Sequence, residues 1–316
     1  MRSLKEVSEV SKRWQVALIL LVILLSGIGI TLAFGRKSGG MNFFQKSRAS
    51  NLSQKAKEAL SNGKLDEALQ NYTEMTQGTP PSEVLAEGLF GIGDVQFEGK
   101  NFLEAKSGYE KVIHDFAASK TAGLAQERLG KVNVAILFSP LMTPTDKKIE
   151  VQPGDSLAKI AKAHETTVDL LMKANQLQNS LIRPGMKLKV PGVHFSIIVD
   201  KSQNTLTLKA GEEIFKVYTV ATGENNSTPV GTFKITDKLV NPVWYTLGAV
   251  VPPESPENVL GSRWLGINEK GYGIHGTRDL SSMGKQITKG CVRMRNEEVE
   301  ELYAVVPIGT EVTIID

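Results

Sequence analysis

Cysteine and histidine are scarce in this sequence, and their scarcity removes whole classes of site. Among 316 residues there is one cysteine, so neither an intramolecular disulfide nor a thiolate zinc cage can form. The four histidines (His114, His164, His194 and His275) lack metal-ligand spacing, and the sequence has neither an HExxH motif nor a Walker-type loop. We therefore expect no metal and no cofactor.

The sequence also has no large excess of positive or negative residues, because the net charge is only +3. Nucleic-acid-binding proteins usually carry a concentrated basic face, so we set that class aside. The content of 41% hydrophobic and 22% charged residues is that of ordinary globular protein. The length is sufficient for two or three domains.

A long uncharged run occupies residues 16–34, after a short basic segment at residues 1–15. Nineteen helical residues would span roughly 28 Å, close to the hydrocarbon thickness of a bilayer. The run is longer than the apolar part of a signal peptide, and no A-x-A site follows it. It predicts an uncleaved transmembrane anchor. The basic residues on its two sides are equal in number, so they do not set its orientation.

Residues 47–138 have the apolar periodicity of helices, and two stretches within them are alike. Gly63-Lys64-Leu65-Asp66-Glu67-Ala68 resembles residues 99–105, and Tyr72 and Tyr109 follow them 37 residues apart. This is near the period of about 34 residues of tetratricopeptide repeats, which the segment resembles. Such repeats are helix hairpins that stack on one another. They would either bind a protein partner or act as a spacer above the membrane.

Residues 142–145 are predicted to be a linker, and the next segment has the order strand, helix, helix, strand. Asp155 or Ser156 is placed to cap its first helix. Residues 148–192 resemble a LysM domain: V-x-P-G-D-S-L opens the segment, Asn175 is central and I-x-P-G-x-x-L-x-V-P closes it. That family binds the N-acetylglucosamine backbone of peptidoglycan or chitin. The resemblance implies glycan binding, and a purely architectural role is the alternative.

From residue 195 the pattern changes to short alternating strands, including a hairpin over residues 196–209. Punctuation by glycine, proline and asparagine predicts a mainly-β domain. One helix is expected over residues 296–305, with Asn296 placed to cap it.

The cysteine, Cys291, lies in a segment suited to acyl transfer. Such a reaction needs a thiolate nucleophile, a base and donors for the oxyanion. Gly290 permits close approach of the backbone, and the flanking Lys289 and Arg293 are expected to favour the thiolate. His275 stands sixteen residues earlier, in I-H-G-T. A free cysteine is otherwise often a small buried apolar residue.

The whole segment 194–316 resembles the catalytic domain of the L,D-transpeptidases. Four ordered motifs carry the resemblance: T-P-V-G-T-F at residues 228–233, N-P-V-W-Y at 241–245, E-N-V-L-G-S-R-W-L-G at 257–266, and the pair I-H-G-T with T-K-G-C-V-R-M. The first of these motifs is expected to be a turn scaffold because Pro-Val-Gly favours a turn.

The resemblance implies roles for individual residues. Cys291 would be the acylated nucleophile and His275 its base, oriented by the backbone carbonyl of Gly276. The N–H groups of Gly290 and Cys291 would help to bind the oxyanion. Arg293 would bind a substrate carboxylate or hold the loop.

Two further pairs of residues are candidates for substrate contact. Thr288 and Lys289 stand where most members have Ser and His, so one possible proton carrier is missing. Trp244 and Tyr245 would line the donor cleft or belong to the core.

The prediction is therefore a multidomain membrane protein: a transmembrane helix, a tetratricopeptide-like α-helical region, a small α+β LysM domain (βααβ) and a mainly-β catalytic domain. It would form a thioester with a peptidoglycan tetrapeptide stem and transfer it to an amine, giving a 3→3 cross-link. Because that substrate is outside the membrane, the N-terminus would be cytoplasmic. Water or a protein amine as acceptor, and a non-catalytic wall-binding scaffold, are the alternatives.

Overall fold

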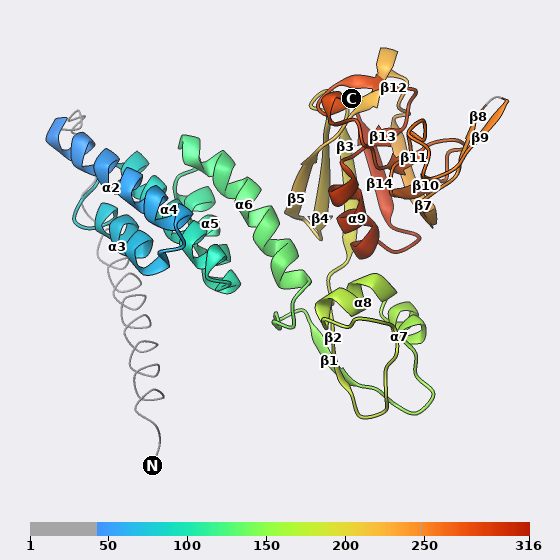
Figure 1. The fold of residues 1–316 in the computed structure, drawn as a ribbon, viewed down its shortest axis with the longest axis horizontal. Coiled ribbons are helices and arrows are strands. Elements are labelled where there is room, and N and C mark those ends of the chain that lie inside the picture. The colour runs from blue at the N-terminus through green and yellow to red at the C-terminus, as the bar shows by residue number, and fades with distance from the viewer. Residues whose placement is uncertain (1–42, 247) are drawn as a thin grey trace. The chain divides into compact units, whose positions relative to one another are not determined.

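The computed structural model describes residues 43–246 and 248–316, and residues 48–316 form one compact unit. The predicted tail and transmembrane anchor, residues 1–34, lie outside the described residues. Within the described ranges, no helix combines the length and apolar character needed to cross a membrane. The order of elements is a helical region, a small α+β region and a β-rich region (Figure 1).

The helical region consists of α-helices, as its periodicity predicts, and the structure shows five of them. They are α2 (Phe43–Ser61), α3 (Leu65–Met75), α4 (Ser82–Glu98), α5 (Phe102–Asp115) and α6 (Lys120–Leu137). Pro81 directly precedes α4, where its missing N–H costs no helical hydrogen bond.

The two matching tyrosines explain why α4 contains glycine. Tyr72 on α3 and Tyr109 on α5 are both buried. A Cβ atom at Gly91 would lie 2.3 Å from the Tyr72 ring, and one at Gly93 would lie 2.7 Å from the Tyr109 ring. Glycine weakens a helix by about 1 kcal/mol relative to alanine. Here it provides the space in which both rings pack.

The second region has the predicted strand–helix–helix–strand order: β1 (Lys147–Glu150), α7 (Leu157–Ala163), α8 (Val168–Ala174) and β2 (Lys187–Val190). The two strands pair antiparallel. Ser156 is the helix cap, because its Oγ accepts a hydrogen bond from the Lys159 N–H at 3.2 Å. Asp155 instead accepts from the Gln152 N–H at 2.7 Å and holds the preceding turn.

Asn175, the central residue of the motif, joins helix α8 to strand β2. Its amide nitrogen donates to the carbonyls of Leu171 and Lys189, both at 2.8 Å, and its oxygen accepts from the Lys189 N–H at 2.7 Å. One side chain thus bonds to the backbone of both elements and holds them together.

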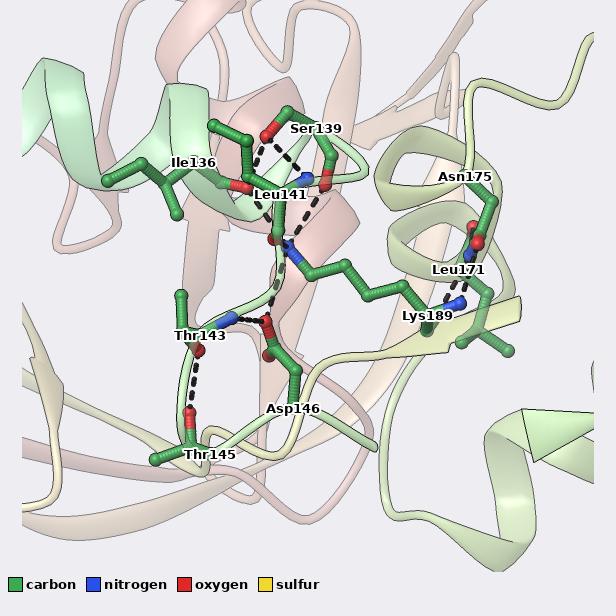
Figure 2. Close-up of polar contacts among 9 residues, drawn as sticks. All are labelled: Ile136, Ser139, Leu141, Thr143, Thr145, Asp146, Leu171, Asn175 and Lys189. Carbon is green, nitrogen blue, oxygen red and sulfur yellow. Dashed lines mark hydrogen bonds and ion pairs between the residues drawn. The ribbon is translucent and has the colours of Figure 1, made fainter. Parts of the chain in front are cut away.

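The Lys189 side chain joins this region to the end of helix α6. Its ammonium donates to the carbonyls of Ile136, Ser139 and Leu141 at 3.1, 3.0 and 2.5 Å, and lies 3.4 Å from the Asp146 carboxylate (Figure 2). Both charged side chains are almost fully buried. A cation at a helix C-terminus is favourable because the last carbonyls lack helical partners.

The β-rich region is built on an eight-stranded sheet with the order β13-β11-β10-β7-β14-β3-β4-β5. Its strands are β3 (Phe195–Asp200), β4 (Thr205–Ala210), β5 (Glu213–Thr219), β7 (Gly231–Val240), β10 (Arg263–Ile267), β11 (Gly273–His275), β13 (Val292–Arg293) and β14 (Glu311–Ile315). The predicted hairpin is β3–β4, while β14–β3 and β11–β13 are parallel. Helix α9 (Asn296–Val305) contributes Val299 and Leu302 to the core of this region.

The expected cap of helix α9 is wrong. The helix begins at Asn296, the preceding Arg295 is the N-cap residue, and no side chain caps it. The Asn296 oxygen accepts a hydrogen bond from the Ser262 N–H at 3.0 Å instead. A hypothetical Cβ at Gly276 would lie 2.3 Å from the same oxygen. Asn296 therefore packs against the Gly276 backbone.

Helix α6 packs against strand β5, which is one of the two edge strands of the large sheet. Its Asn133 amide donates to the Phe215 carbonyl at 2.9 Å. A Cβ at Gly130 would lie 2.9 Å from Lys216, so the helix backbone packs closely against the strand. The last helix of the first region is thus joined to the β-rich region.

Candidate active site

Parallel pairing of β11 and β13 brings the predicted catalytic residues into adjacent strands. Ile274 is opposite Val292, and His275 is opposite Arg293. Ile274 and Val292 are buried in the core. Because side chains alternate along a strand, His275 and Arg293 lie on the other face of the sheet. Cys291 directly precedes β13, so alternation places it on that face too.

The loop before Cys291 is fixed by Thr288, which ends strand β12 (Gln286–Thr288). The Thr288 hydroxyl donates to the Cys291 carbonyl at 2.6 Å and accepts from the Gly290 N–H at 3.2 Å. Thr288 is buried, whereas Lys289 is exposed. Thr288 therefore shapes the loop rather than offering its hydroxyl to a substrate. Its bond to Gly290 would have to be exchanged before that N–H could bind an oxyanion.

Gly290 cannot be replaced without strain. Its φ of +120° lies in the region that L-residues with a side chain rarely adopt. A Cβ there would also lie 2.6 Å from the Tyr272 ring. The glycine before the cysteine is needed for the shape of the loop.

The His275 side chain is buried and forms a hydrogen bond with the backbone of the next residue, Gly276. Its Nδ1 lies 2.7 Å from the Gly276 carbonyl oxygen. A carbonyl can only accept, so Nδ1 carries the proton and neutral His275 has its lone pair on Nε2. Burial lowers the pKa of His275 from 6.5 to about 4, and the nearby Arg293 charge acts in the same direction. At neutral pH this side chain is an unprotonated base.

The Cys291 thiol is partly buried beside the backbone of residues 271–273. Its Sγ lies 3.6 Å from the Gly271 carbonyl oxygen. Burial raises the pKa of Cys291, while a hydrogen bond from the Gly273 N–H and the charge of Arg293 oppose that effect. The prediction that Cys291 is ionised is therefore wrong. Burial outweighs the flanking charge, and the resting group is a thiol.

Arg293 is the one flanking charge that acts on both catalytic candidates. Its guanidinium lies 3.9 Å from Asp279, and its Nε is buried without a hydrogen-bond partner in the described part of the chain. Such a donor is costly to leave unpaired.

Trp244 and Tyr245 lie on a small separate hairpin, β8 (Trp244–Thr246) with β9 (Ala249–Val251). Tyr245 is 74% exposed, so it is not a core aromatic residue. The amide of Asn258 donates to the carbonyls of Pro242 and Val251 at 3.0 and 3.3 Å and holds the base of the hairpin.

Trp264 is a residue of this site that the sequence patterns did not single out. It is opposite His275 in the β10–β11 pair, and its ring stacks on the imidazole with centroids 6.1 Å apart and an angle of 20°. The residue stands in a quoted motif, but only the register of the strands shows which side chain it meets. Among the described residues, no group of three or more histidine, cysteine or acidic side chains is placed to bind a metal ion.

Comparison with known proteins agrees with this geometry. The L,D-transpeptidase catalytic domain model matches residues 194–314, and the LysM domain model matches residues 149–191. YkuD of Bacillus subtilis (strain 168), a protein named as an L,D-transpeptidase, is 33% identical over 172 residues, which cover 52% of this chain and 96% of that protein. The chain belongs to the L,D-transpeptidase family.

Two further similarities concern the catalytic domain of this L,D-transpeptidase. YqjB of Bacillus subtilis, also named as an L,D-transpeptidase, is 42% identical over 126 residues, covering 38% of this chain and 70% of that protein. The catalytic domain from the E. faecium L,D-transpeptidase is 21% identical, covers 39% of this chain and 97% of that chain, and has a TM-score of 0.33.

Proposed function

We propose that this L,D-transpeptidase acts on peptidoglycan stems through Cys291 as nucleophile and His275 as general base. The observation that carries the proposal is the state of His275, which is buried, neutral and hydrogen-bonded to the Gly276 carbonyl. That arrangement leaves Nε2 free to accept a proton. Cys291 directly precedes the neighbouring strand β13, and strand alternation places it on the same face of the sheet as His275.

Acylation starts from a neutral pair, because Cys291 is a thiol and His275 is unprotonated. The thiol proton passes to His275 as the sulfur attacks the carbonyl that joins the diamino acid to D-Ala in a tetrapeptide stem. Arg293 favours the negative charge that forms. His275 then gives the proton to the departing amine of D-Ala, and a thioester remains on Cys291.

An amine resolves the thioester in the second half of the reaction. The side-chain amine of another stem attacks the thioester carbonyl, His275 accepts its proton, and the thiol is restored. The product is a 3→3 cross-link. Arg293 would bind the stem carboxylate or hold the loop, and Trp244 and Tyr245 would line the donor side of the cleft.

The LysM domain would bind the glycan part of the same polymer. Binding there raises the local concentration of stems around Cys291 without any new contact in the active site. Contacts from helix α6 to both the LysM region and the catalytic sheet support this role.

The rest of the chain would hold the enzyme at the membrane. The uncharged run at residues 16–34 is the proposed single-pass anchor, with a cytoplasmic N-terminus and an extracytoplasmic catalytic region. The helical region is a tetratricopeptide-like unit that would bind a protein partner. Cleavage of the catalytic region by protease added outside intact cells tests the orientation.

Intact-mass measurement after exposure to a carbapenem tests the nucleophile, since the L,D-transpeptidase family is acylated by that class. The wild-type protein should gain the mass of one drug molecule, and peptide mapping should place it at Cys291. Cys291→Ala should gain none. His275→Gln should react at least about 100-fold more slowly, as expected for loss of a general base. The matched control His164→Gln should behave like the wild type.

The acceptor is tested on purified tetrapeptide muropeptides by mass spectrometry. A cross-linked dimer with loss of D-Ala supports the stem amine. A tripeptide monomer alone would identify water as the acceptor, and a protein-linked stem would identify a protein amine. Equal release of D-Ala by the wild type and Cys291→Ala would overturn the proposal.

A further inference from the structure

A row of side chains crosses four strands of the large sheet at the candidate active site. Leu239 on β7 is opposite Trp264 on β10, Trp264 is opposite His275 on β11, and His275 is opposite Arg293 on β13. Residues that face one another across paired strands point to the same face. Trp264 is therefore the neighbour of His275 on the side away from Arg293.

The indole of Trp264 contacts both the imidazole and the backbone next to the thiol. It stacks on His275 with an interplanar angle of 20°. A Cβ at Gly273 would lie 2.7 Å from Trp264 Cζ2, so the ring lies directly over that glycine. The Gly273 N–H is the group that donates to Cys291. The Trp264 indole thus packs against both the His275 imidazole and the Gly273 backbone, which lie next to the reacting atoms.

The indole is held in place from its other edge by Asp237. Trp264 Nε1 donates to Asp237 Oδ1 at 3.0 Å, and the Thr236 hydroxyl donates to Asp237 Oδ2 at 2.9 Å. The carboxylate lies over Gly266, where a Cβ would be 2.1 Å from Oδ2. An N–H bonded to a carboxylate has a fixed direction, so Asp237 determines the orientation of the ring.

We propose that Trp264, oriented by Asp237, is a positioning residue that keeps His275 in its neutral, base-competent orientation. The inference rests on the proposed roles of His275 and Cys291. Trp264 does not react. It restricts rotation of the imidazole and excludes water from one of its faces.

Two effects of the ring on His275 oppose one another. Removal of water disfavours the imidazolium, whereas the π-face of an indole attracts a cation. Burial is the largest cause of the low pKa of His275, and the stacked indole contributes to that burial, so we expect exclusion of water to be the larger effect of the ring. Loss of the indole should therefore make His275 easier to protonate.

The single cysteine permits a test that needs no substrate. Iodoacetamide can alkylate one thiol only, and intact mass gives its rate at each pH. In the wild type, assistance from neutral His275 should appear as a limb of the pH–rate profile with a midpoint near pH 4. Histidine NMR, with the signal assigned from His275→Gln, gives the same midpoint independently.

The variants are Trp264→Ala, Trp264→Phe and Asp237→Ala, with Val240→Ala as the matched control. Trp264→Ala should raise both midpoints by about one pH unit or more, toward the ordinary value of histidine. Trp264→Phe and Asp237→Ala should raise them less, because a ring remains. Val240→Ala removes exposed apolar surface from strand β7 and should leave them unchanged.

The outcomes separate this inference from the proposed function. If His275→Gln has the wild-type profile, the proposed catalytic pair fails and the inference fails with it. If His275→Gln loses the limb but folded Trp264 variants keep the wild-type midpoint, only the inference is overturned. A lower midpoint in Trp264→Ala would also overturn it. If Trp264→Ala does not fold, the midpoints of Trp264→Phe and Asp237→Ala decide in the same way.

Discussion

Replacement of Lys189 by methionine should weaken the junction between helix α6 and the LysM region more than any surface change nearby. Methionine keeps most of the apolar length of the side chain but removes the ammonium. Three carbonyls then lose a donor, and the Asp146 carboxylate loses its cation while it remains buried. Asp146 keeps one partner, the Thr143 N–H at 2.7 Å.

The magnitude follows from the burial of the pair. Removal of one member of a buried ion pair costs about 3–5 kcal/mol, because the other charge is left uncompensated. The double variant Lys189→Met/Asp146→Asn should recover part of this loss, since its amide is neutral and can still accept from Thr143. Lys187→Met is the matched control. Lys187 lies on the same strand but is exposed, so its change should stay within about 0.5 kcal/mol.

Urea unfolding followed by circular dichroism at 222 nm measures these differences. That signal reports mainly the helices, and helix α6 is one side of the junction. The midpoint should fall clearly in Lys189→Met, recover partly in the double variant, and stay near the wild type in Lys187→Met. If Lys189→Met and Lys187→Met unfold at the same urea concentration, the buried ammonium does not hold the junction.

Three further changes have defined outcomes. Gly91→Ala should destabilise the helical region by about 1–3 kcal/mol because the methyl meets the Tyr72 ring, whereas Gly123→Ala, where no atom lies within 4 Å, should leave thermal stability unchanged or higher. Gly290→Ala should slow carbapenem adduct formation by about 100-fold through displacement of the loop, and a wild-type rate would contradict the required φ. The pKa of about 4 for folded His275 means that the unfolded chain binds its proton first as pH falls from 6.5. Stability should therefore fall by about 3 kcal/mol between pH 6.5 and pH 4, and chemical denaturation at several pH values should show this loss reduced in His275→Gln.

Local pattern was sufficient to predict the order of elements. The α9 helix covers residues 296–305 as expected, and the turn around Asp155 and Ser156 precedes the predicted helix. These features depend on periodicity and on capping residues within a few positions of one another. The cap of α9 could not be predicted in the same way, because the Asn296 side chain bonds to Ser262, which is 34 residues away.

The state of the catalytic residues depended on burial and strand register, which the sequence does not contain. Flanking basic residues suggested an ionised Cys291, but desolvation of the thiol outweighs the charge of Arg293. Thr288 looked like a substrate contact because of its motif, yet its hydroxyl is used twice within the loop. Trp264 became visible only when the β10–β11 register placed it against His275.

The cover that helix α6 provides over strand β5 has a consequence for shorter forms of this protein. An uncovered edge strand offers free N–H and C=O groups to any other strand, and this promotes aggregation. Ile214 and Val217 on β5 already have more than 40% of their surface exposed. A truncated protein that lacks helices α2–α6 would also expose the part of β5 that α6 covers, and would enlarge that apolar surface. We therefore expect removal of helix α6 to promote self-association of the catalytic region through β5.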